Sequence, residues 1–138
     1  MEQKSQQDYL RAIYTLLERK NNGSLGVKSV DIAQFLGISK AGVSQMIKRL
    51  SQKGLIKSDS YSNVFLTTKG LGLAKRITHN YRVIEVFLKN TLGYNSPDKL
   101  LQEAHKLEHA FSDALIKRLD IFLHHPKKCP HGDLIHEK

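Results

Sequence analysis

The sequence contains a single cysteine, few acidic residues and no long apolar run. Because Cys129 has no second cysteine to pair with, an intrachain disulfide is excluded and a reducing compartment is expected. No apolar stretch approaches the roughly 18–20 residues of a membrane span, and no apolar signal core follows the first residues. We therefore predict a cytoplasmic protein with no membrane partner.

The shortage of acidic residues leaves a strongly basic chain. Thirteen Asp and Glu residues stand against 22 Lys and Arg residues, which gives a net charge of +9 and an isoelectric point near 9.7. The basic excess is larger in residues 1–70 than in residues 71–138. Such an excess indicates an anionic partner, with nucleic acid ahead of a membrane surface. The length of 138 residues allows one domain, or a small domain with a dimerisation extension.

The pattern of residues 29–50 is typical of a helix-turn-helix. Ser29 is expected to cap a first helix, and Gly37 is expected to end it, because glycine accepts the left-handed backbone of a tight turn. Ser39 is expected to cap a second helix. No carboxylate occurs in residues 39–50, so the outer face of this helix is polar and basic, as a helix that contacts DNA requires.

Other periodic segments flank this motif. Residues 6–20 predict an amphipathic helix, which the polar residues 21–24 would end. Residues 55–58 and 64–67 alternate as two short strands around a polar turn, which predicts a wing. A long helix should follow from a cap at Thr67 or Thr68, and its sustained apolar stripe suggests a dimer interface. The stripe consists of Leu73, Ile77, Tyr81, Ile84 and Leu88.

A later helix, opened by Ser96 and Pro97, carries a group of metal-capable side chains. His105, Glu108 and His109 share one face, because residues at i, i+3 and i+4 lie within about 100° of one another. Imidazole and carboxylate donors suit a divalent first-row cation. Solvated helix surfaces also contain His and Glu, and one class of zinc peptidases has the same H-x-x-E-H string, so these residues alone leave several interpretations open.

Two further segments complete the chain. Ser112 should cap a final helix that stops before Pro126, with apolar positions at Leu115, Ile116, Leu119, Phe122 and Leu123. The tail that follows contains Cys129 and His131 at irregular spacing. We predict an ordered tail that could supply a second set of metal ligands.

Several motifs in this order resemble the diphtheria toxin repressor family, whose members sense iron or manganese. The motifs are Gln7-Asp8-Tyr9-Leu10-Arg11-Ala12-Ile13-Tyr14, the helix-turn-helix, the wing ending in Leu66-Thr67-Thr68-Lys69-Gly70, Glu103-Ala104-His105-Lys106-Leu107-Glu108-His109, and Cys129-Pro130-His131-Gly132. The resemblance covers nearly the whole chain. It implies a mainly α-helical protein with a winged helix-turn-helix domain in residues 1–70 and a helical metal-binding and dimerisation domain in residues 71–138. Longer members append an SH3-like domain.

The resemblance also implies a function and its sites. A homodimer loaded with a divalent metal would repress transcription by binding palindromic double-stranded operator DNA, and would thereby control metal-ion homeostasis. The implied metal ligands are Asp8, His105, Glu108 and His109. A possible second site would use Glu85, Cys129 and His131. The candidate DNA contacts are Ser29, Ser39, Lys40, Gly42, Ser44, Gln45, Lys48, Arg49 and Tyr61.

The metal and the mode of regulation have alternatives. His105 departs from the cysteine of the iron branch and the glutamate of the manganese branch, so the ligand set does not select one metal: it suits Mn(II), Fe(II), Co(II) or Zn(II). The resemblance makes Mn(II) or Fe(II) the expected metal, with Zn(II) or Co(II) as the alternatives. Tyr81 and Leu101 replace the histidines of the iron branch's ancillary site. Arg11 replaces a carboxylate of the manganese branch. A metal-independent, MarR-like winged-helix regulator is the main alternative, and a small metal hydrolase is a second one. We expect no enzyme and no small organic substrate.

Overall fold

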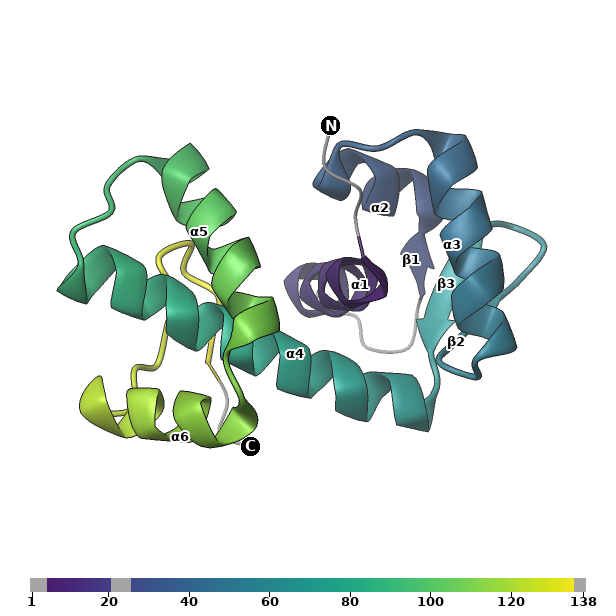
Figure 1. Cartoon of the computed structure of the whole chain (residues 1–138). Coiled ribbons are helices and arrows are strands. Elements are labelled where there is room, and N and C mark those ends of the chain that lie inside the picture. The colour runs from purple at the N-terminus through teal and green to yellow at the C-terminus, as the bar shows by residue number, and fades with distance from the viewer. Residues whose placement is uncertain (1–4, 21–25, 136–138) are drawn as a thin grey trace. The chain divides into compact units, whose positions relative to one another are not determined.

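The computed structural model describes residues 5–20 and 26–135 and divides into two compact units, Met1–Lys75 and Arg76–Lys138. The boundary falls inside a long helix, five residues after the division expected from the sequence. The predicted mainly helical fold is confirmed in both units (Figure 1). The polar segment 21–24, which was expected to end the first helix, lies outside the described residues.

The first unit is built around helix α1, Gln6–Lys20, whose bounds agree with the sequence prediction. Its inner face places Leu10 and Ile13 in the apolar core of the unit, where both are fully buried. Tyr9 on the same helix is buried, and its hydroxyl lies 3.5 Å from the carbonyl oxygen of Gly42. Helix α1 therefore contacts the start of the helix that the sequence assigns to DNA.

Helices α2 (Ser29–Leu36) and α3 (Lys40–Gln52) form the predicted helix-turn-helix. Gly37 between them has a φ of 67°, the left-handed conformation expected of it. Ser39 caps α3 by accepting a hydrogen bond from the Gly42 amide at 3.1 Å. The prediction that Ser29 caps α2 is wrong. Ser29 is the first helical residue, and Lys28 holds the capping position without a side-chain bond.

The wing belongs to a three-stranded antiparallel sheet in the order β1-β3-β2. Strands β2 (Ile56–Ser58) and β3 (Asn63–Leu66) are the two strands that the sequence predicts. Strand β1 (Val27–Lys28) was not predicted, because two residues are too few to show an alternating pattern. β1 pairs with β3 directly before α2, so the wing is attached to the start of the helix-turn-helix.

Helix α4, Thr68–Val86, follows β3. Thr67 caps it by accepting a hydrogen bond from the Gly70 amide at 3.0 Å, and its own hydroxyl donates to the Gly54 carbonyl at 2.7 Å. Gly70 packs so closely on the sheet that a Cβ there would overlap the carbonyl oxygen of Leu55. A glycine is therefore required where α4 leaves the wing.

In the second unit α4 continues into a π-helical turn, η1 (Phe87–Thr91), and is followed by α5 (Pro97–Ala110) and α6 (Asp113–Phe122). The predicted caps Ser96 and Ser112 accept bonds from the amides of Lys99 and Leu115, respectively. Most of the apolar stripe of α4 packs inside this unit: Tyr81, Ile84 and Leu88 belong to its core cluster, and Ile77 is buried as well. It is thus part of the unit's own core and not the free interface that the sequence suggested.

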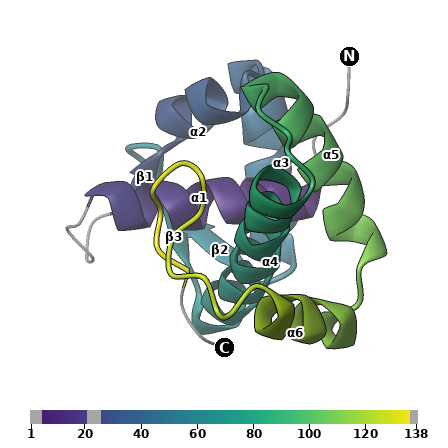
Figure 2. The ribbon, with the colours of Figure 1, turned by 90° about the vertical axis from the view of Figure 1, so that its left-hand side faces the viewer.

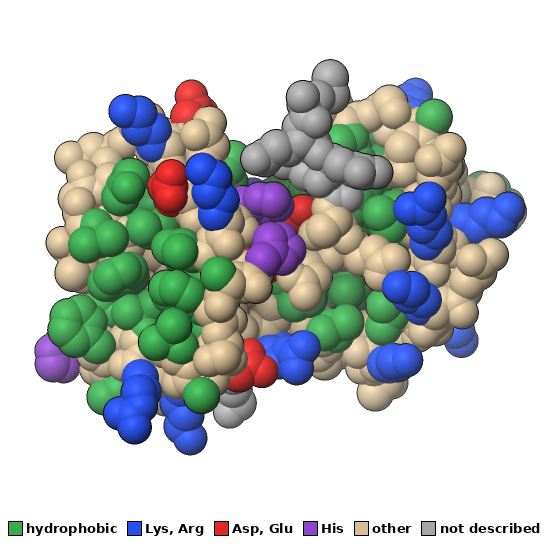
Figure 3. All heavy atoms as spheres, viewed as in Figure 1, with side chains coloured by type: hydrophobic (Ala, Val, Ile, Leu, Met, Phe, Trp, Pro, Cys, Tyr) green, Lys and Arg blue, Asp and Glu red, His purple; other side chains and the backbone are tan. Residues whose placement is uncertain are grey.

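The exposed apolar side chains of the second unit lie elsewhere. Only Ile116 of the predicted α6 stripe is buried, while Leu115 and Phe122 are 45% and 62% exposed. Figure 3 shows hydrophobic side chains gathered on one face of this unit. Leu92, Leu101 and Ile121 are exposed as well. An apolar surface of this kind is typical of a protein interface. No helix of the described residues is long and apolar enough to cross a membrane.

Candidate metal centres and DNA interface

Helix α5 presents the metal-capable face that the sequence predicts. The His105 and His109 rings meet edge to face with their centroids 5.1 Å apart, and each offers a ring nitrogen within 4.8 Å of the other. Glu108 lies between them in sequence and is 9% exposed. Two imidazoles and a nearly buried carboxylate therefore belong to one rigid helix, a donor set that suits a first-row divalent cation.

Asp8, the fourth predicted ligand, belongs to the first unit and is buried. Its Oδ2 accepts hydrogen bonds from the Ser5 amide at 2.8 Å and the Ser5 hydroxyl at 2.9 Å. Arg11 Nη2 lies 3.5 Å from Oδ1. Burial, followed by the negative charge of Asp8, raises the pKa of Tyr9. The Asp8 carboxylate is thus held in a fixed orientation on α1 by its neighbours in the chain.

Within the second unit, the tail brings Cys129 and His131 to Glu85 on α4. The carboxylate, thiol and imidazole ligand atoms all lie within 4.8 Å of one another. His131 Nδ1 is 3.0 Å from Glu85 Oε2. Metal–ligand bonds are about 2.0–2.3 Å, so small side-chain rotations would place all three donors around one ion. The donors fit a divalent metal with affinity for sulfur and nitrogen.

A short hairpin positions the two candidate ligands of the tail, Cys129 and His131. Lys128 and Leu134 form an antiparallel bridge, and the Ile135 amide donates to the Lys127 carbonyl at 2.8 Å. Between these pairs the Cys129 amide donates to the Asp133 carbonyl at 2.9 Å, and Gly132 turns the chain with a φ of 87°. The yellow tail in Figure 2 contains this hairpin. The irregular spacing of the ligands in sequence therefore results from a turn.

The environment of Cys129 keeps its thiol protonated in the absence of a cation. Burial raises the pKa of this thiol, and the negative charge of Glu85 raises it further. The Sγ atom lies 3.9 Å from Asp133 Oδ2. A bound divalent cation reverses this effect, because it displaces the proton and stabilises the thiolate. A buried thiol beside a buried carboxylate is therefore suited to a cation.

The predicted DNA contacts form an exposed surface of the first unit. All candidates on α3 except Gly42 are exposed, Gly42 and Ser29 are half-buried, and Tyr61 at the wing tip is 78% exposed. Lys and Arg side chains are spread over the visible face of this unit in Figure 3. The surface combines cations for phosphate with short polar side chains for base edges.

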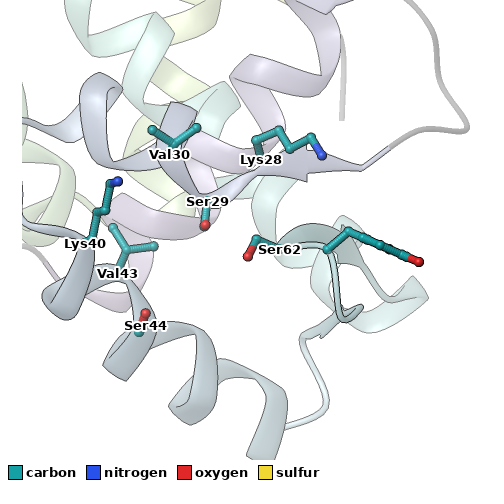
Figure 4. A pocket seen from close by; sticks show the side chains of 8 residues that line it. Lys28, Ser29, Val30, Lys40, Val43, Ser44 and Ser62 are labelled. Atoms are coloured by element: carbon teal, nitrogen blue, oxygen red, sulfur yellow. The ribbon is translucent and has the colours of Figure 1, made fainter.

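A pocket of about 410 Å³ lies within this surface, between the start of α2, the start of α3 and the wing (Figure 4). The Ser29, Ser44 and Ser62 hydroxyls point toward it from three sides. Sequence reasoning did not select Lys28 or Ser62, because their pairing across β1 and the wing is not visible along the chain. The Ser62 backbone carbonyl accepts a hydrogen bond from the Ser29 amide at 3.0 Å, which ties the wing to α2.

Together, the winged helix-turn-helix and the helical unit with clustered metal donors define a DNA-binding regulator of the metal-responsive class. The family model for the iron-dependent repressor N-terminal DNA-binding domain matches residues 1–64. The model for the metal-binding and dimerisation domain of the same repressors matches residues 67–137. The chain belongs to this family of metal-dependent transcriptional regulators.

Individual relatives agree with this assignment. An uncharacterised HTH-type transcriptional regulator of Methanocaldococcus jannaschii is 35% identical over 85% of this chain and 90% of its own length. The transcriptional regulator MntR of Escherichia coli O157:H7 is 32% identical over 83% of this chain and 70% of its own. The solved structure of the manganese regulator SloR superposes with a TM-score of 0.82 at 39% identity and covers 99% of this chain. This chain spans 61% of that structure. The comparisons give no support to a MarR-like regulator.

Proposed function

We propose that the chain is a homodimeric repressor that binds a palindromic DNA operator when loaded with a divalent metal, Mn(II) or Fe(II) in the first instance. One observation carries this proposal: the chain that contains a basic winged helix-turn-helix also has three candidate metal ligands, His105, Glu108 and His109, on one face of α5. The proposed location is the cytoplasm, where the operator DNA would be bound. No catalytic activity is proposed. The similarity to SloR, a manganese regulator, supports the choice of metal.

The regulatory site of this proposal joins Asp8 to His105, Glu108 and His109. Asp8 is held on α1 by Ser5, and α1 also contacts the start of α3 through Tyr9. The other three donors are fixed on α5. A cation shared by both sets supplies a bond between the DNA-binding unit and the dimerisation unit. That bond restricts the separation of the two reading helices in a dimer, for which DNA requires about 34 Å or a multiple.

The homodimer would use the exposed apolar surface of the second unit. Leu101, Leu115 and Phe122 are partly or largely exposed on α5 and α6. The matched family model describes this part of the chain as a dimerisation domain, which supports a second copy as the occupant. Substituting Phe122→Asp would place a charge in that interface and should yield monomers in sedimentation experiments. Val30→Asp, an equally drastic change on the exposed start of α2, should leave the dimer intact.

DNA binding would use α3 and the wing, with the pocket at Ser29, Ser44 and Ser62 holding a backbone phosphate. Lys28 and Lys40 line the same pocket and supply positive charge. Substituting Lys40→Ala should weaken binding to all sequences alike and reduce its salt dependence, since a phosphate contact carries no base information. Gln45→Ala should instead reduce the preference for the operator over random DNA.

The decisive experiment is a DNA-binding titration of Asp8→Ala and Asp8→Asn with Mn(II). A metal that moves a dimer from 1:99 to 99:1 in favour of the binding-competent state contributes about 5.5 kcal/mol. Both variants should therefore bind operator weakly at every metal concentration, while Asp8→Asn keeps acceptor capacity for Ser5. Asp31→Ala, which removes a carboxylate paired with Lys20 on the surface, is the control. Metal-dependent binding that survives in both Asp8 variants would defeat the shared site.

The second site, Glu85, Cys129 and His131, is proposed to bind a further divalent ion and to stabilise the tail. Its three donors come from one unit and lie within 4.8 Å of one another. Titration of wild-type protein with Co(II) should reveal two binding events, and Cys129→Ser should remove one of them. A single event in the wild type would exclude this site.

A further inference from the structure

Arg82 is a buried cation that none of the proposed sites uses. It lies on α4, one helical turn before Glu85, and is only 4% exposed. Burying a guanidinium removes it from water at a substantial cost, unless its N–H groups find acceptors. A buried arginine on a helix that also carries a candidate metal ligand therefore calls for a structural reason.

Arg82 contacts the tail hairpin. Its Nη1 donates a hydrogen bond of 2.7 Å to the Leu134 carbonyl oxygen. Leu134 pairs with Lys128, the residue directly before Cys129. The guanidinium thus binds one strand of the hairpin at the residue pair next to Cys129.

Glu85 lies against the other part of the same hairpin. Its Oε2 lies 3.0 Å from His131 Nδ1, near the turn at Gly132. Because residues at i and i+3 share a helix face, Arg82 and Glu85 present opposite charges to the hairpin from adjacent turns of α4. Glu85 is a proposed metal ligand, whereas Arg82 is not. The bond from Arg82 to Leu134 ends on a backbone carbonyl, so this bond depends on the path of the hairpin and not on the Leu134 side chain.

We propose that Arg82 is the positioning residue of the second metal site. By fixing the Leu134 carbonyl it holds the hairpin on α4, so that Cys129 and His131 stay beside Glu85 whether or not a cation is bound. This inference rests on the proposed second site for its metal-binding consequence. The holding of the hairpin itself does not depend on any metal.

The test uses the full-length protein with Arg82→Met, which keeps the length and apolar stem of the side chain but removes every donor. Arg82→Lys retains the charge but has a single donor nitrogen in place of the planar guanidinium. Arg76→Met is the matched control, because Arg76 lies on the same helix, is half-exposed and pairs with Asp113 instead of the hairpin. Far-UV circular dichroism establishes that each variant is folded.

Two measurements are made on each variant. The first is the alkylation rate of Cys129 by iodoacetamide in metal-free protein. The second is a Co(II) titration followed by the thiolate-to-cobalt charge-transfer band. Since Cys129 is the only cysteine, this band reports on the second site alone. Loss of a residue that orients metal ligands typically lowers metal affinity by about 10–100-fold.

Arg82→Met should therefore alkylate at least about tenfold faster and bind Co(II) at the thiolate at least about tenfold more weakly than wild type. The alkylation rate and Co(II) affinity of Arg82→Lys should lie between those of Arg82→Met and wild type. Arg76→Met should match wild type in both. Wild-type values for Arg82→Met in both measurements would overturn the proposal. If Arg82→Met does not fold, Arg82→Lys decides, and wild-type behaviour of that variant overturns it.

The outcome also separates this inference from the proposed site. A wild-type protein that binds Co(II) without a charge-transfer band disproves the second metal site. The alkylation rates then still decide whether Arg82 holds the hairpin. Accelerated alkylation in Arg82→Met supports the positioning role, and an unchanged rate refutes it.

Discussion

The two units bury different kinds of side chain. Among the described residues, the first unit buries only two polar side chains, Asp8 and Thr15, beside an aliphatic core. The second unit is slightly smaller and buries five, including Arg82, Glu85 and Glu108. A buried charge destabilises a fold unless partners compensate it. The interior of the first unit is therefore mainly apolar. The second unit buries charged groups, and a bound cation would compensate the carboxylates among them.

The first prediction tests how strongly the first unit depends on packing. Substituting Gly70→Ala forces a Cβ against the Leu55 carbonyl oxygen, a backbone atom that cannot move aside without disturbing the sheet. We expect a loss of about 3 kcal/mol in the free energy of unfolding, at the upper end of overpacking effects. Urea denaturation followed by circular dichroism measures it.

Gly72→Ala provides the matched control for that experiment. Gly72 lies two residues later on α4, and nothing lies within 4 Å of a Cβ placed there. Because alanine favours a helix over glycine, this variant should be more stable than wild type by about 0.5–1 kcal/mol. Equal effects of the two substitutions would show that the contact with Leu55 is not tight in solution.

The second prediction concerns the charged interior of the second unit. A ligand at about 100 times its Kd stabilises the state that binds it by about 2.7 kcal/mol. Co(II) should therefore slow hydrogen exchange at the Cys129 and Ile135 amides, which both bond within the hairpin. Glu85→Gln should abolish this protection. Glu103→Gln, on the surface of α5 and paired with Lys106, should leave it unchanged.

The third prediction returns to the first unit and is smaller. Ser39→Ala removes the acceptor for the Gly42 amide at the start of α3 and should cost about 1 kcal/mol. Ser39→Asn keeps an equally good cap and should restore the stability. If operator binding drops in both variants while stability drops only in the first, the hydroxyl also contacts DNA.

The fourth prediction is a pH effect at the wing tip. Hydrogen bonds from Asn63, followed by that from Tyr61, hold the pKa of Asp59 below its usual range. Its contribution to wing order is therefore present above the ordinary carboxyl pKa and is lost as the pH falls through the lowered value. NMR amide shifts of Tyr61 and Asn63 should move in that range. Asp59→Asn keeps an acceptor for both amides and should remove the titration; a wing that still titrates in this variant would contradict the assignment.

The sequence predicted the local features well, because their causes lie within a few residues. The bounds of α1, the left-handed turn at Gly37 and the caps at Ser39, Ser96 and Ser112 all follow from short-range chemistry. The metal-capable face of α5 follows from helical periodicity in the same way. The Ser29 cap failed because β1 pairs with the wing and brings Lys28 to the capping position.

The periodicity of α4 predicted an apolar stripe but not its partner. The pattern is the same whether the stripe faces its own chain or a second copy. Only the tertiary structure shows that Ile84 and Leu88 are buried within the second unit. For the same reason, the exposure of Leu115 and Phe122 on α6 could not be predicted from their spacing.

What the sequence determined by itself is therefore the helices, their caps, the basic face of α3 and the residues of α5 that can bind a metal. The resemblance implied a possible site of Glu85, Cys129 and His131, but only the tertiary structure showed that their donor atoms lie together and that Arg82 is buried against the hairpin that carries two of them. The physical reason is distance along the chain. Helical periodicity and capping act over one or two turns, whereas the hairpin contacts join residues about 50 positions apart through packing that no local pattern records.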